Sequence, residues 1–328
     1  MIITRTPLRI SFLGGGTDYP AWYREHPGAV LATTIDKYCY ISCRRLPPFF
    51  KYKSRIVYSK TELINQLEEI EHPSVKGCLK FLNIHDGLEI HHDADLPART
   101  GLGSSSAFTV GLLHALYALK GKMISKEQLC RDAIKVERHI IQENVGSQDQ
   151  TLTSHGGFNH ICFSGENTIE ISPIILPSSR LKELHSHLMI IFTSFSRIAS
   201  HIVVEQLQNI SKKIKELQTM YEMVQEGINI LNNQRDITDF GHLLHESWKL
   251  KKSLSSNIST PLIDEIYTVA RKEGVIGGKL LGAGAGGFLL LFAKPEHHSQ
   301  IKDKLAPLLH VPFEFESKGS QIIFYSPA

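Results

Sequence analysis

Residues 97–106 (the serine loop), PARTGLGSSS, place two glycines and three serines directly before an apolar segment. Gly101 and Gly103 can adopt positive φ and let the backbone approach a ligand closely. The serines would sit at the start of a helix, where unpaired N–H groups and a partial positive charge favour phosphate. An ordinary helix with a capping serine explains the segment equally well. The lysine of the common P-loop is absent, so that motif is excluded.

Two further glycine clusters lie beside predicted strands. FLGGGTD, residues 12–18, contains the first glycine loop (residues 14–18), and GAGAGG forms the last glycine loop (residues 282–287). A tight turn explains either cluster alone. Three such loops in one chain, each next to a strand, favour a ligand-binding cleft over three unrelated turns.

The segments RTPLRISFLGGGTDYP, PARTGLGSSSA and KLLGAGAGGFLLLFA resemble, in this order, the three motifs of the GHMP kinases, a family that includes galactokinase and mevalonate kinase. The resemblance covers essentially the whole chain, and an ordered trio is more specific than one loop. The opening TPLRISFLGGGTD, residues 195–206 and residues 245–259 are similar to the branch that phosphorylates D-glycero-D-manno-heptose 7-phosphate. Galactokinase carries a Glu-His pair where Gly15 and Gly16 stand here, which argues against galactose as the substrate.

The resemblance implies a kinase that uses ATP and Mg²⁺ to phosphorylate the anomeric hydroxyl of a sugar phosphate, giving a heptose 1,7-bisphosphate from the 7-phosphate. It implies an α+β fold of two lobes with the active site between them. The N-terminal lobe, residues 1–182, would resemble domain 2 of ribosomal protein S5, and the C-terminal lobe, residues 183–328, would be ferredoxin-like. Alternatives are a kinase of this family for fucose, mevalonate or homoserine, a decarboxylase of the diphosphomevalonate kind, and a sugar sensor that binds ATP without turnover.

Two residues are assigned to the reaction itself. Asp149 lies in a Gly-x-x-Asp-Gln loop that resembles the loop holding the catalytic Asp of galactokinase and mevalonate kinase, and it would take the proton of the acceptor hydroxyl. Arg9 resembles the basic residue of the first motif and would hold Asp149 and stabilise the transferring phosphoryl group. The alternatives are a loop-capping aspartate and a charge at the edge of a strand. Because Asp149, Arg9 and Ser105 are all intact, we favour an enzyme over a sensor.

The resemblance also implies a metal pair and a nucleotide site. Glu137 with Ser105 would hold Mg²⁺, as a glutamate and a loop serine do in mevalonate kinase; a solvated helix glutamate is the alternative. The residues expected to bind the nucleotide are Gly101, Leu102, Gly103, Ser104, Ser105, Ser106 and Gly284.

Substrate contacts are expected at the first glycine loop. Asp18 resembles the family's substrate-binding aspartate, with Gly16 and Thr17 beside it; an Asx-turn is an equally good explanation of Asp18. A phosphate on the acceptor requires a cationic pocket, for which the candidates are Arg197, Lys251 and Lys252. Lysine pairs on helices are usually surface charge, which is the alternative for Lys251 and Lys252.

The surrounding elements follow from hydrophobic patterns. Strands are predicted at residues 2–13, 28–35, 38–44, 51–59, 88–94, 158–163, 188–193, 288–293 and 321–325. Helices are predicted at residues 61–82, 107–119, 125–142, 199–225, 238–254 and 260–273, with a loop at 146–157. Strands and helices mix without strict βαβ repetition, which favours the α+β class with two lobes.

Composition sets the broad class. The 328 residues carry a formal net charge of +3 and no cluster of basic and aromatic residues, so a nucleic-acid partner has no support. Five scattered cysteines without metal-ligand spacing indicate reduced, mostly buried thiols. No apolar run is long enough to span a membrane. We therefore expect a cytoplasmic enzyme whose partners are ATP and a sugar phosphate, and a homodimer is compatible with the sequence.

Overall fold

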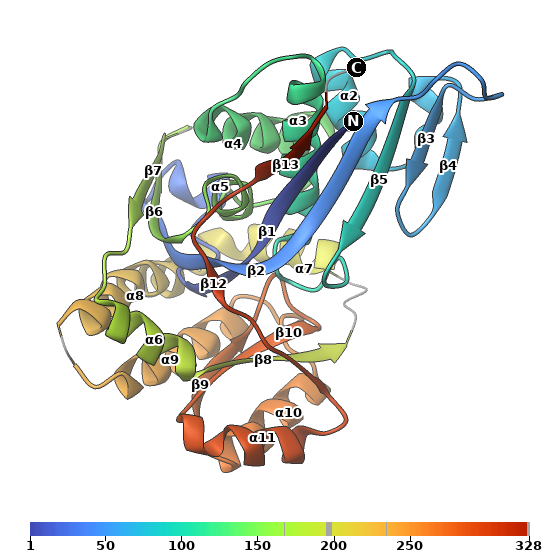
Figure 1. Cartoon of the computed structure of the whole chain (residues 1–328). Coiled ribbons are helices and arrows are strands. Elements are labelled where there is room, and N and C mark those ends of the chain that lie inside the picture. The colour runs from blue at the N-terminus through green and yellow to red at the C-terminus, as the bar shows by residue number, and fades with distance from the viewer. Residues whose placement is uncertain (167, 195–198, 234, 327–328) are drawn as a thin grey trace.

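The computed structural model describes residues 1–166, 168–194, 199–233 and 235–326. Two β-sheets, each with helices packed against it, form an upper and a lower part in the view of Figure 1. The α+β class predicted from the sequence is confirmed.

The larger sheet forms the upper part. Among the described residues it has nine strands, in the order β13-β1-β2-β5-β3-β4, with β6 and β12 pairing with β2, and β7 with β6. Its strands are β1 (Ile2–Leu13), β2 (Gly28–Arg45), β3 (Ser54–Val57), β4 (Thr61–Ile64), β5 (Leu88–Ala94), β6 (Phe158–Ser164), β7 (Thr168–Pro173), β12 (Phe315–Glu316) and β13 (Gln321–Tyr325). All pairs are antiparallel except β3 with β5.

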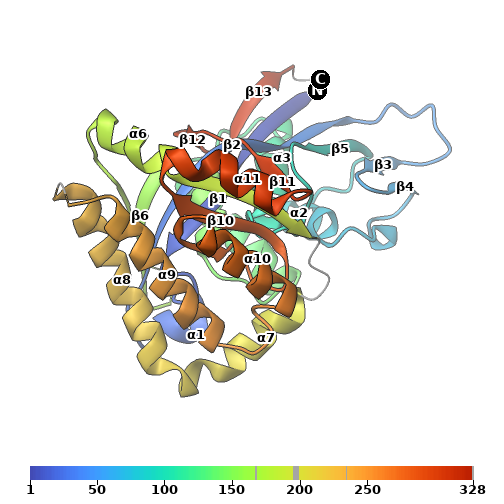
Figure 2. The same ribbon diagram turned by 90° about the horizontal axis from the view of Figure 1, so that it is seen from below.

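The smaller sheet forms the lower part. Its order is β11-β8-β10-β9 and all pairs are antiparallel. The strands are β8 (Leu188–Ser194), β9 (Val275–Leu280), β10 (Gly287–Ala293) and β11 (Leu309–Val311). The helices of this part are α7 (Ala199–Asn209), α8 (Ile214–Asn232), α9 (Thr238–Ser253), α10 (Pro261–Lys272) and α11 (His298–Leu305), and Figure 2 shows α8 and α9 running side by side.

Helix α3 (Ser104–Leu119) is the central helix of the upper part and packs against β1 and β2. Its almost uninterrupted apolar sequence is buried on nearly every side. It begins three residues before the predicted start, because Gly103 adopts a left-handed conformation (φ 75°) as N-cap and the three serines form the first turn. The other helices are α1 (Pro20–Tyr23), α2 (Pro73–Leu82), α4 (Lys126–Lys135), α5 (Gln148–His155) and α6 (Ser178–Ser186).

One predicted turn is part of a strand. Residues 28–35 and 38–44 were expected as two strands, but β2 is continuous over 18 residues. The register against β1 shifts between Pro7 and Leu8, so that Asp36 and Lys37 have no partner on β1. They form a bulge, which bends the strand without ending it.

The predicted loop at residues 146–157 is wrong, because residues 148–155 form helix α5. The segment lacks the apolar spacing of an amphipathic helix, and its contacts with α3, α4 and β1 stabilise it instead. Hydroxyl groups inside the helix donate back to carbonyls one turn earlier, as in Thr151 to Ser147 (2.6 Å) and Thr153 to Asp149 (2.8 Å).

Two predicted helices are also interrupted. Residues 61–82 begin with strand β4, which pairs with β3, and become helical only at Pro73. Residues 199–225 divide into α7 and α8 around a short 3₁₀ turn at Ile210–Lys212. Local propensity favours a helix in both segments, and pairing with neighbouring elements decides where each begins.

The last strands return to the first sheet. Strand β12 pairs with β2 and β13 with β1, so both ends of the chain lie together in Figures 1 and 2. The division into residues 1–182 and 183–328 stays a prediction; its boundary falls inside α6, and residues 315–325 lie with the upper part.

The described cysteines are all free, four of them buried and Cys162 partly buried, as predicted. Among the described residues, no helix is long and apolar enough to cross a membrane.

Candidate active site

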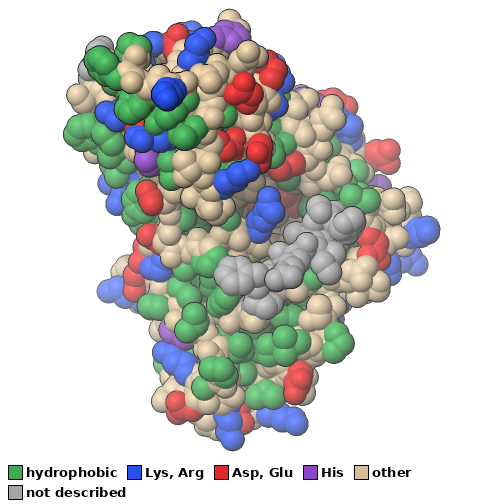
Figure 3. Space-filling model, turned by 90° about the vertical axis from the view of Figure 1, so that its right-hand side faces the viewer, with side chains coloured by type: hydrophobic (Ala, Val, Ile, Leu, Met, Phe, Trp, Pro, Cys, Tyr) green, Lys and Arg blue, Asp and Glu red, His purple; other side chains and the backbone are tan. Residues whose placement is uncertain are grey.

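A cleft lies where the three glycine-containing loops meet, and Figure 3 shows basic side chains beside the hollow between the two parts of the molecule. The first glycine loop, the serine loop and the last glycine loop all line it. The last two loops touch backbone to backbone, because a Cβ added at Gly282 would lie 2.4 Å from the Cα of Gly101. Only glycine allows this approach, so the sequence pattern that predicted a cleft has a direct steric cause.

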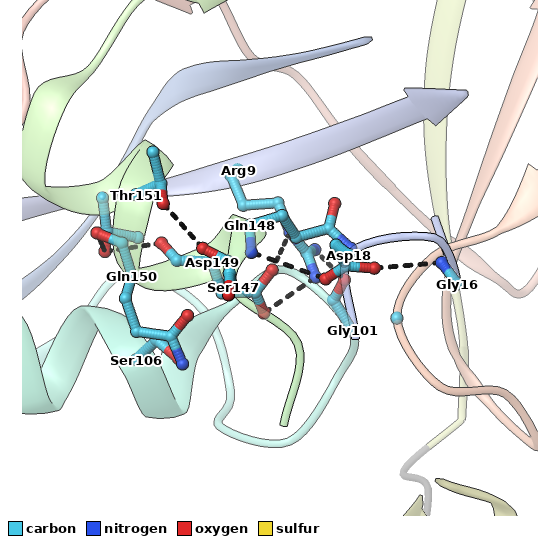
Figure 4. A network of polar contacts seen from close by, with 12 residues as sticks. Arg9, Gly16, Asp18, Gly101, Ser106, Ser147, Gln148, Asp149, Gln150 and Thr151 are labelled. Carbon is cyan, nitrogen blue, oxygen red and sulfur yellow. Dashed lines mark hydrogen bonds and ion pairs between the residues drawn. The ribbon is translucent and has the colours of Figure 1, made fainter. Parts of the chain in front are cut away.

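Arg9 and Asp149 form a bidentate ion pair on one wall of the cleft. The Arg9 Nε donates to Asp149 Oδ1 (2.8 Å) and Nη2 donates to Oδ2 (2.9 Å), as Figure 4 shows. Nη1 donates to the carbonyl of Gly101. Arg9 comes from β1 and is almost fully buried, whereas Asp149, at the start of α5, keeps a quarter of its side chain exposed. The arginine fixes the orientation of a carboxylate that remains accessible to a ligand.

The ion pair lies directly against the serine loop. A Cβ at Gly103 would lie 3.4 Å from Asp149 Oδ2 and 3.1 Å from the Cγ of Arg9. The backbone N–H of Arg9 also donates to the Leu102 carbonyl (3.0 Å). The structure thus places the accessible carboxylate beside the start of helix α3, where backbone N–H groups favour an anion.

Asp18, the last residue of the first glycine loop, is buried. Its Oδ1 accepts from the N–H of Gly16 (3.0 Å) and its Oδ2 from the N–H of Gln148 (3.4 Å). Gly146 approaches so closely that a Cβ there would lie 1.8 Å from Asp18 Oδ2. Burial raises the pKa of Asp18, and the charge of Asp149 adds to the effect. An Asx-turn would need Asp18 to accept from the N–H two residues later, but that residue is Pro20, whose nitrogen carries no hydrogen. Asp18 accepts from the preceding Gly16 instead, and it lines the cleft.

A second hollow opens on the other side of the serine loop. Arg99, Ser104 and Ser105 line both hollows. The second one is also lined by the rings of His72, His92 and Phe108, with His72 stacked on Phe108 at 4.5 Å between centroids. Flat rings beside an anion-binding helix start suit a group that is planar at one end and phosphorylated at the other.

Two models of known protein families match this chain. Residues 73–157 match the family model for the GHMP kinases N terminal domain, and residues 226–307 match the model for the GHMP kinases C terminal domain. The chain belongs to the GHMP kinase family. It is accordingly an ATP-dependent phosphotransferase that acts on a hydroxyl group, and ATP with Mg²⁺ is the family's phosphoryl donor.

Individual relatives cover nearly the whole of this GHMP kinase. A D-glycero-alpha-D-manno-heptose 7-phosphate kinase from Campylobacter jejuni is 27% identical over 90% of both chains. A galactokinase from Thermotoga maritima is 22% identical over 98% of this chain and 96% of its own. The crystal structure of a D-glycero-D-manno-heptose 1-phosphate kinase from Bacteriodes thetaiotaomicron superposes with a TM-score of 0.80 at 23% identity, covering 99% of this chain and 100% of that one. This likeness confirms the GHMP kinase fold expected from the three motifs.

The metal-binding pair predicted for this GHMP kinase is arranged differently from the expectation. Glu137 Oε2 accepts from Ser106 Oγ (3.0 Å) and from Gln150 Nε2, whereas Ser105 is exposed at the cleft. Successive helical residues point about 100° apart, so only one of the two serines can face Glu137. Glu137 lies in a π-helical turn, Val136–Ile140, that continues α4.

The residues at this position fit Mg²⁺. Within the described part of the chain, Glu137 Oε1 is buried without a hydrogen-bond partner, and burial raises the pKa of Glu137 to about 7. A carboxylate and a serine hydroxyl are oxygen ligands of the kind that Mg²⁺ takes in kinases, with water and phosphate oxygens completing the set. A cation next to Oε1 would satisfy the orphaned oxygen and lower the pKa.

The predicted nucleotide-binding residues divide into two groups. Gly101, Gly103, Ser104, Ser105, Ser106 and Gly284 line the cleft. Leu102 does not: its side chain is fully buried in the core, and only its carbonyl, which accepts from Arg9, takes part in the site. The apolar Leu102 side chain packs into the core because burial removes it from water.

The predicted substrate residues are only partly brought together. Gly16 and Asp18 line the cleft, but Thr17 is buried and its hydroxyl bonds to the backbone of Gly14 and Ala29. Lys252 pairs with Asp264 (3.0 Å) away from the cleft, as the surface-charge alternative proposed. Arg197 lies outside the described residues.

Lys251 is buried at the cleft, with its Nζ donating to the carbonyls of Leu280 (2.9 Å) and Gly282 (2.5 Å). Burial, with the charge of Arg9 contributing, lowers the pKa of Lys251 to about 7. This lysine was predicted as a ligand of an acceptor phosphate, and the structure shows it within the same cleft as Asp149 and Asp18.

The sequence interpretation missed Lys279, which is fully buried at the end of β9 and lines the cleft. Its Nζ donates to the carbonyl of Phe12 (2.9 Å) and so joins the two sheets. Burial lowers the pKa of Lys279 well below its usual range, with Lys251 and Arg9 contributing. A lysine inside an apolar strand that precedes a glycine loop was the signal available in the sequence. Ser11, Tyr19 and Gln148 also line the cleft and were missed.

Proposed function

We propose that this GHMP kinase transfers the γ-phosphoryl group of ATP to the anomeric hydroxyl of a sugar phosphate, with D-glycero-D-manno-heptose 7-phosphate as the acceptor. The proposal is supported by the relative from Campylobacter jejuni, whose name states that acceptor and which matches 90% of this chain. It is further supported by a buried carboxylate, Asp18, and two buried ammonium groups in one cleft, a combination that suits an acceptor with both hydroxyl and phosphate groups.

The observation that carries the proposal is the contact between the Arg9–Asp149 pair and Gly103. An accessible carboxylate stands next to the helix start that would hold the triphosphate, so a hydroxyl group bonded to Asp149 would lie near the terminal phosphoryl group. A protein that only binds ATP and a sugar would not need a carboxylate that an arginine holds beside the triphosphate site.

The transfer itself follows from these positions. The acceptor oxygen attacks the γ-phosphorus, the bond from that phosphorus to the bridging oxygen breaks, and ADP leaves. Asp149 receives the hydroxyl proton and passes it to solvent after the transfer. Arg9 holds the carboxylate in place through two hydrogen bonds and adds positive charge where the phosphoryl group carries negative charge.

The nucleotide would span both hollows. The serine loop, which lines both, would bind the phosphates through its backbone N–H groups. The hollow lined by His72, His92 and Phe108 would take the nucleoside. Glu137 and Ser106 would hold Mg²⁺, which neutralises phosphate charge when it is bound.

The test is a coupled assay of ADP release with a panel of acceptors: heptose 7-phosphate, free heptose, galactose, fucose, mevalonate and homoserine. We expect ADP release with heptose 7-phosphate at a kcat/KM at least about tenfold above every other acceptor. Phosphorus NMR of the product should show a new phosphate on the anomeric carbon. A higher kcat/KM with mevalonate or with a free sugar would contradict the proposed acceptor.

A further inference from the structure

Two buried lysine amines in the cleft form no ion pair with any described residue. Among the described residues, no carboxylate oxygen lies within 4.0 Å of the Nζ of Lys251 or of Lys279. Asp149 is already paired with Arg9, and Asp18 accepts from two backbone N–H groups. Buried charges in proteins are normally paired or hydrogen-bonded in full, and those left unpaired mark places where a ligand supplies the counter-charge.

Both amines lie near the end of β9, close enough for the charge of Lys251 to act on Lys279. Lys251 donates to Leu280, the last residue of β9, and to Gly282, whereas Lys279, also in β9, donates to Phe12 of β1. An ammonium group has three N–H donors, of which Lys251 uses two and Lys279 uses one in these bonds. Donors therefore remain on both groups, and both residues line the cleft.

Ser11 provides an independent sign of a ligand at the same place. Its hydroxyl is buried, has no hydrogen-bond partner among the residues that the structure describes, and belongs to a residue that lines the cleft. Ser11 directly precedes Phe12, and the Phe12 carbonyl accepts from the Lys279 amine, so the hydroxyl lies one residue from the carbonyl that holds this amine. A buried hydroxyl without a partner is rare in native proteins and calls for an explanation.

We infer that Lys251, Lys279 and Ser11 form a second phosphate subsite, distinct from the backbone N–H groups at the start of α3. The inference rests on the proposed function and extends it by naming where a phosphate dianion binds. Two sources have this chemistry: the phosphate carried by the acceptor, and the γ-phosphoryl group during transfer. A dianion there favours the protonated form of both buried amines, which a neutral hydroxyl could not do.

The variants are Ser11→Ala, Lys251→Met and Lys279→Met, with Lys252→Met as the matched control. Lys252 is the neighbouring lysine on the same helix, but it pairs with Asp264 outside the cleft. Ser11→Ala removes only an unpartnered hydroxyl, so its fold should be at least as stable as that of the wild type. A loss of function in this variant is therefore not a loss of folding.

The first measurement is binding of inorganic phosphate by calorimetry, which needs no turnover. In the presence of Mg·ADP, we expect phosphate affinity to fall about 10- to 100-fold in each lysine variant and about 3- to 10-fold in Ser11→Ala, and to stay unchanged in Lys252→Met. A non-hydrolysable ATP analogue distinguishes the sources. Phosphate still binds beside the analogue if the subsite belongs to the acceptor, and is excluded if it belongs to the γ-phosphoryl group.

The second measurement is kcat/KM with a phosphorylated acceptor and with the same sugar lacking its phosphate. An acceptor subsite predicts that the variants lose activity only with the phosphorylated sugar, whereas a γ-phosphoryl subsite predicts an equal loss of kcat with both. Wild-type phosphate affinity and kcat/KM in Ser11→Ala and in a folded Lys279→Met would overturn the inference and leave Lys279 as a tie between the sheets. If phosphate binds as expected but no sugar is phosphorylated, the subsite stands and the proposed function fails.

Discussion

Gly101 of the serine loop and Gly282 of the last glycine loop are in direct backbone contact across the cleft. A Cβ at Gly101 would lie 2.3 Å from the Leu281 carbonyl oxygen, and one at Gly282 would lie 2.4 Å from the Gly101 Cα. Both residues have positive φ, 88° and 71°. The contact holds a loop of the upper part against a loop of the lower part. The two loops can approach this closely only because neither Gly101 nor Gly282 has a Cβ, and this approach sets the width of the cleft.

Gly282→Ala is expected to force the two loops apart and to raise the KM for ATP by roughly tenfold or more, because the new Cβ meets backbone that cannot move aside alone. Gly121→Ala is the matched control: Gly121 has a φ of 67°, but no atom of the described residues lies within 4 Å of its added Cβ. Both variants share a conformational cost of about 1 kcal/mol. When ATP is varied in a steady-state assay, the KM for ATP should rise in Gly282→Ala and stay unchanged in Gly121→Ala. A wild-type KM in Gly282→Ala would mean that ATP binding does not depend on the loop contact.

Asp149→Asn should lower kcat by about 100- to 10,000-fold and leave the affinity for ATP nearly unchanged, because the amide cannot accept the hydroxyl proton. One of the two bonds from Arg9 can still be made to the amide oxygen. The measurement pairs kcat with calorimetric binding of the nucleotide. Asp303→Asn, on an exposed part of α11, is the control. Full activity of Asp149→Asn would exclude Asp149 as the base.

Glu137→Gln should raise the Mg²⁺ concentration that gives half-maximal activity by about 10- to 100-fold, because a neutral amide oxygen binds the cation more weakly. The amide can still accept from Ser106, so the fold should be preserved. Titration of Mg²⁺ at saturating ATP checks this. Glu265→Gln, an exposed residue of α10, should behave as the wild type. An unchanged Mg²⁺ requirement would remove Glu137 from the metal site.

The acceptor's KM should rise with pH above about 7. Burial lowers the pKa of Lys251 to about 7, with Arg9 also lowering it and Asp18 opposing the change; Lys279 is the other cation at this place. A phosphate binds the protonated amine and raises its pKa, so affinity is constant below pH 7. Above it, affinity falls up to about tenfold per pH unit as the free enzyme loses the proton.

This pH dependence can be measured as the KM of a phosphorylated acceptor between pH 6.5 and 9, values chosen to lie on both sides of the lysine pKa and above the second phosphate pKa of about 6. Lys251→Arg keeps its charge throughout, since arginine is not deprotonated in proteins, and its KM should not rise in this range. A wild-type KM that is constant up to pH 9 would show that Lys251 stays charged or lies away from the acceptor.

Local sequence patterns were enough to predict the loops that line the cleft. The serine loop and both glycine loops could be predicted because positive φ and close backbone approach depend on only a few consecutive residues. Asp149 and Arg9 were assigned through the motifs that contain them, and the structure brings their side chains together. The α+β class followed from the mixture of strand and helix patterns.

Only the tertiary structure decided which distant residues meet. Helix α5 has no amphipathic pattern and forms because it is packed between other elements. Ser106 rather than Ser105 bonds to Glu137 because of the direction in which the first turn of α3 faces that residue. Lys279 and Ser11 are single polar residues within apolar strands. The role of such a residue depends on which groups of the other sheet lie next to it, and no local sequence pattern predicts those contacts.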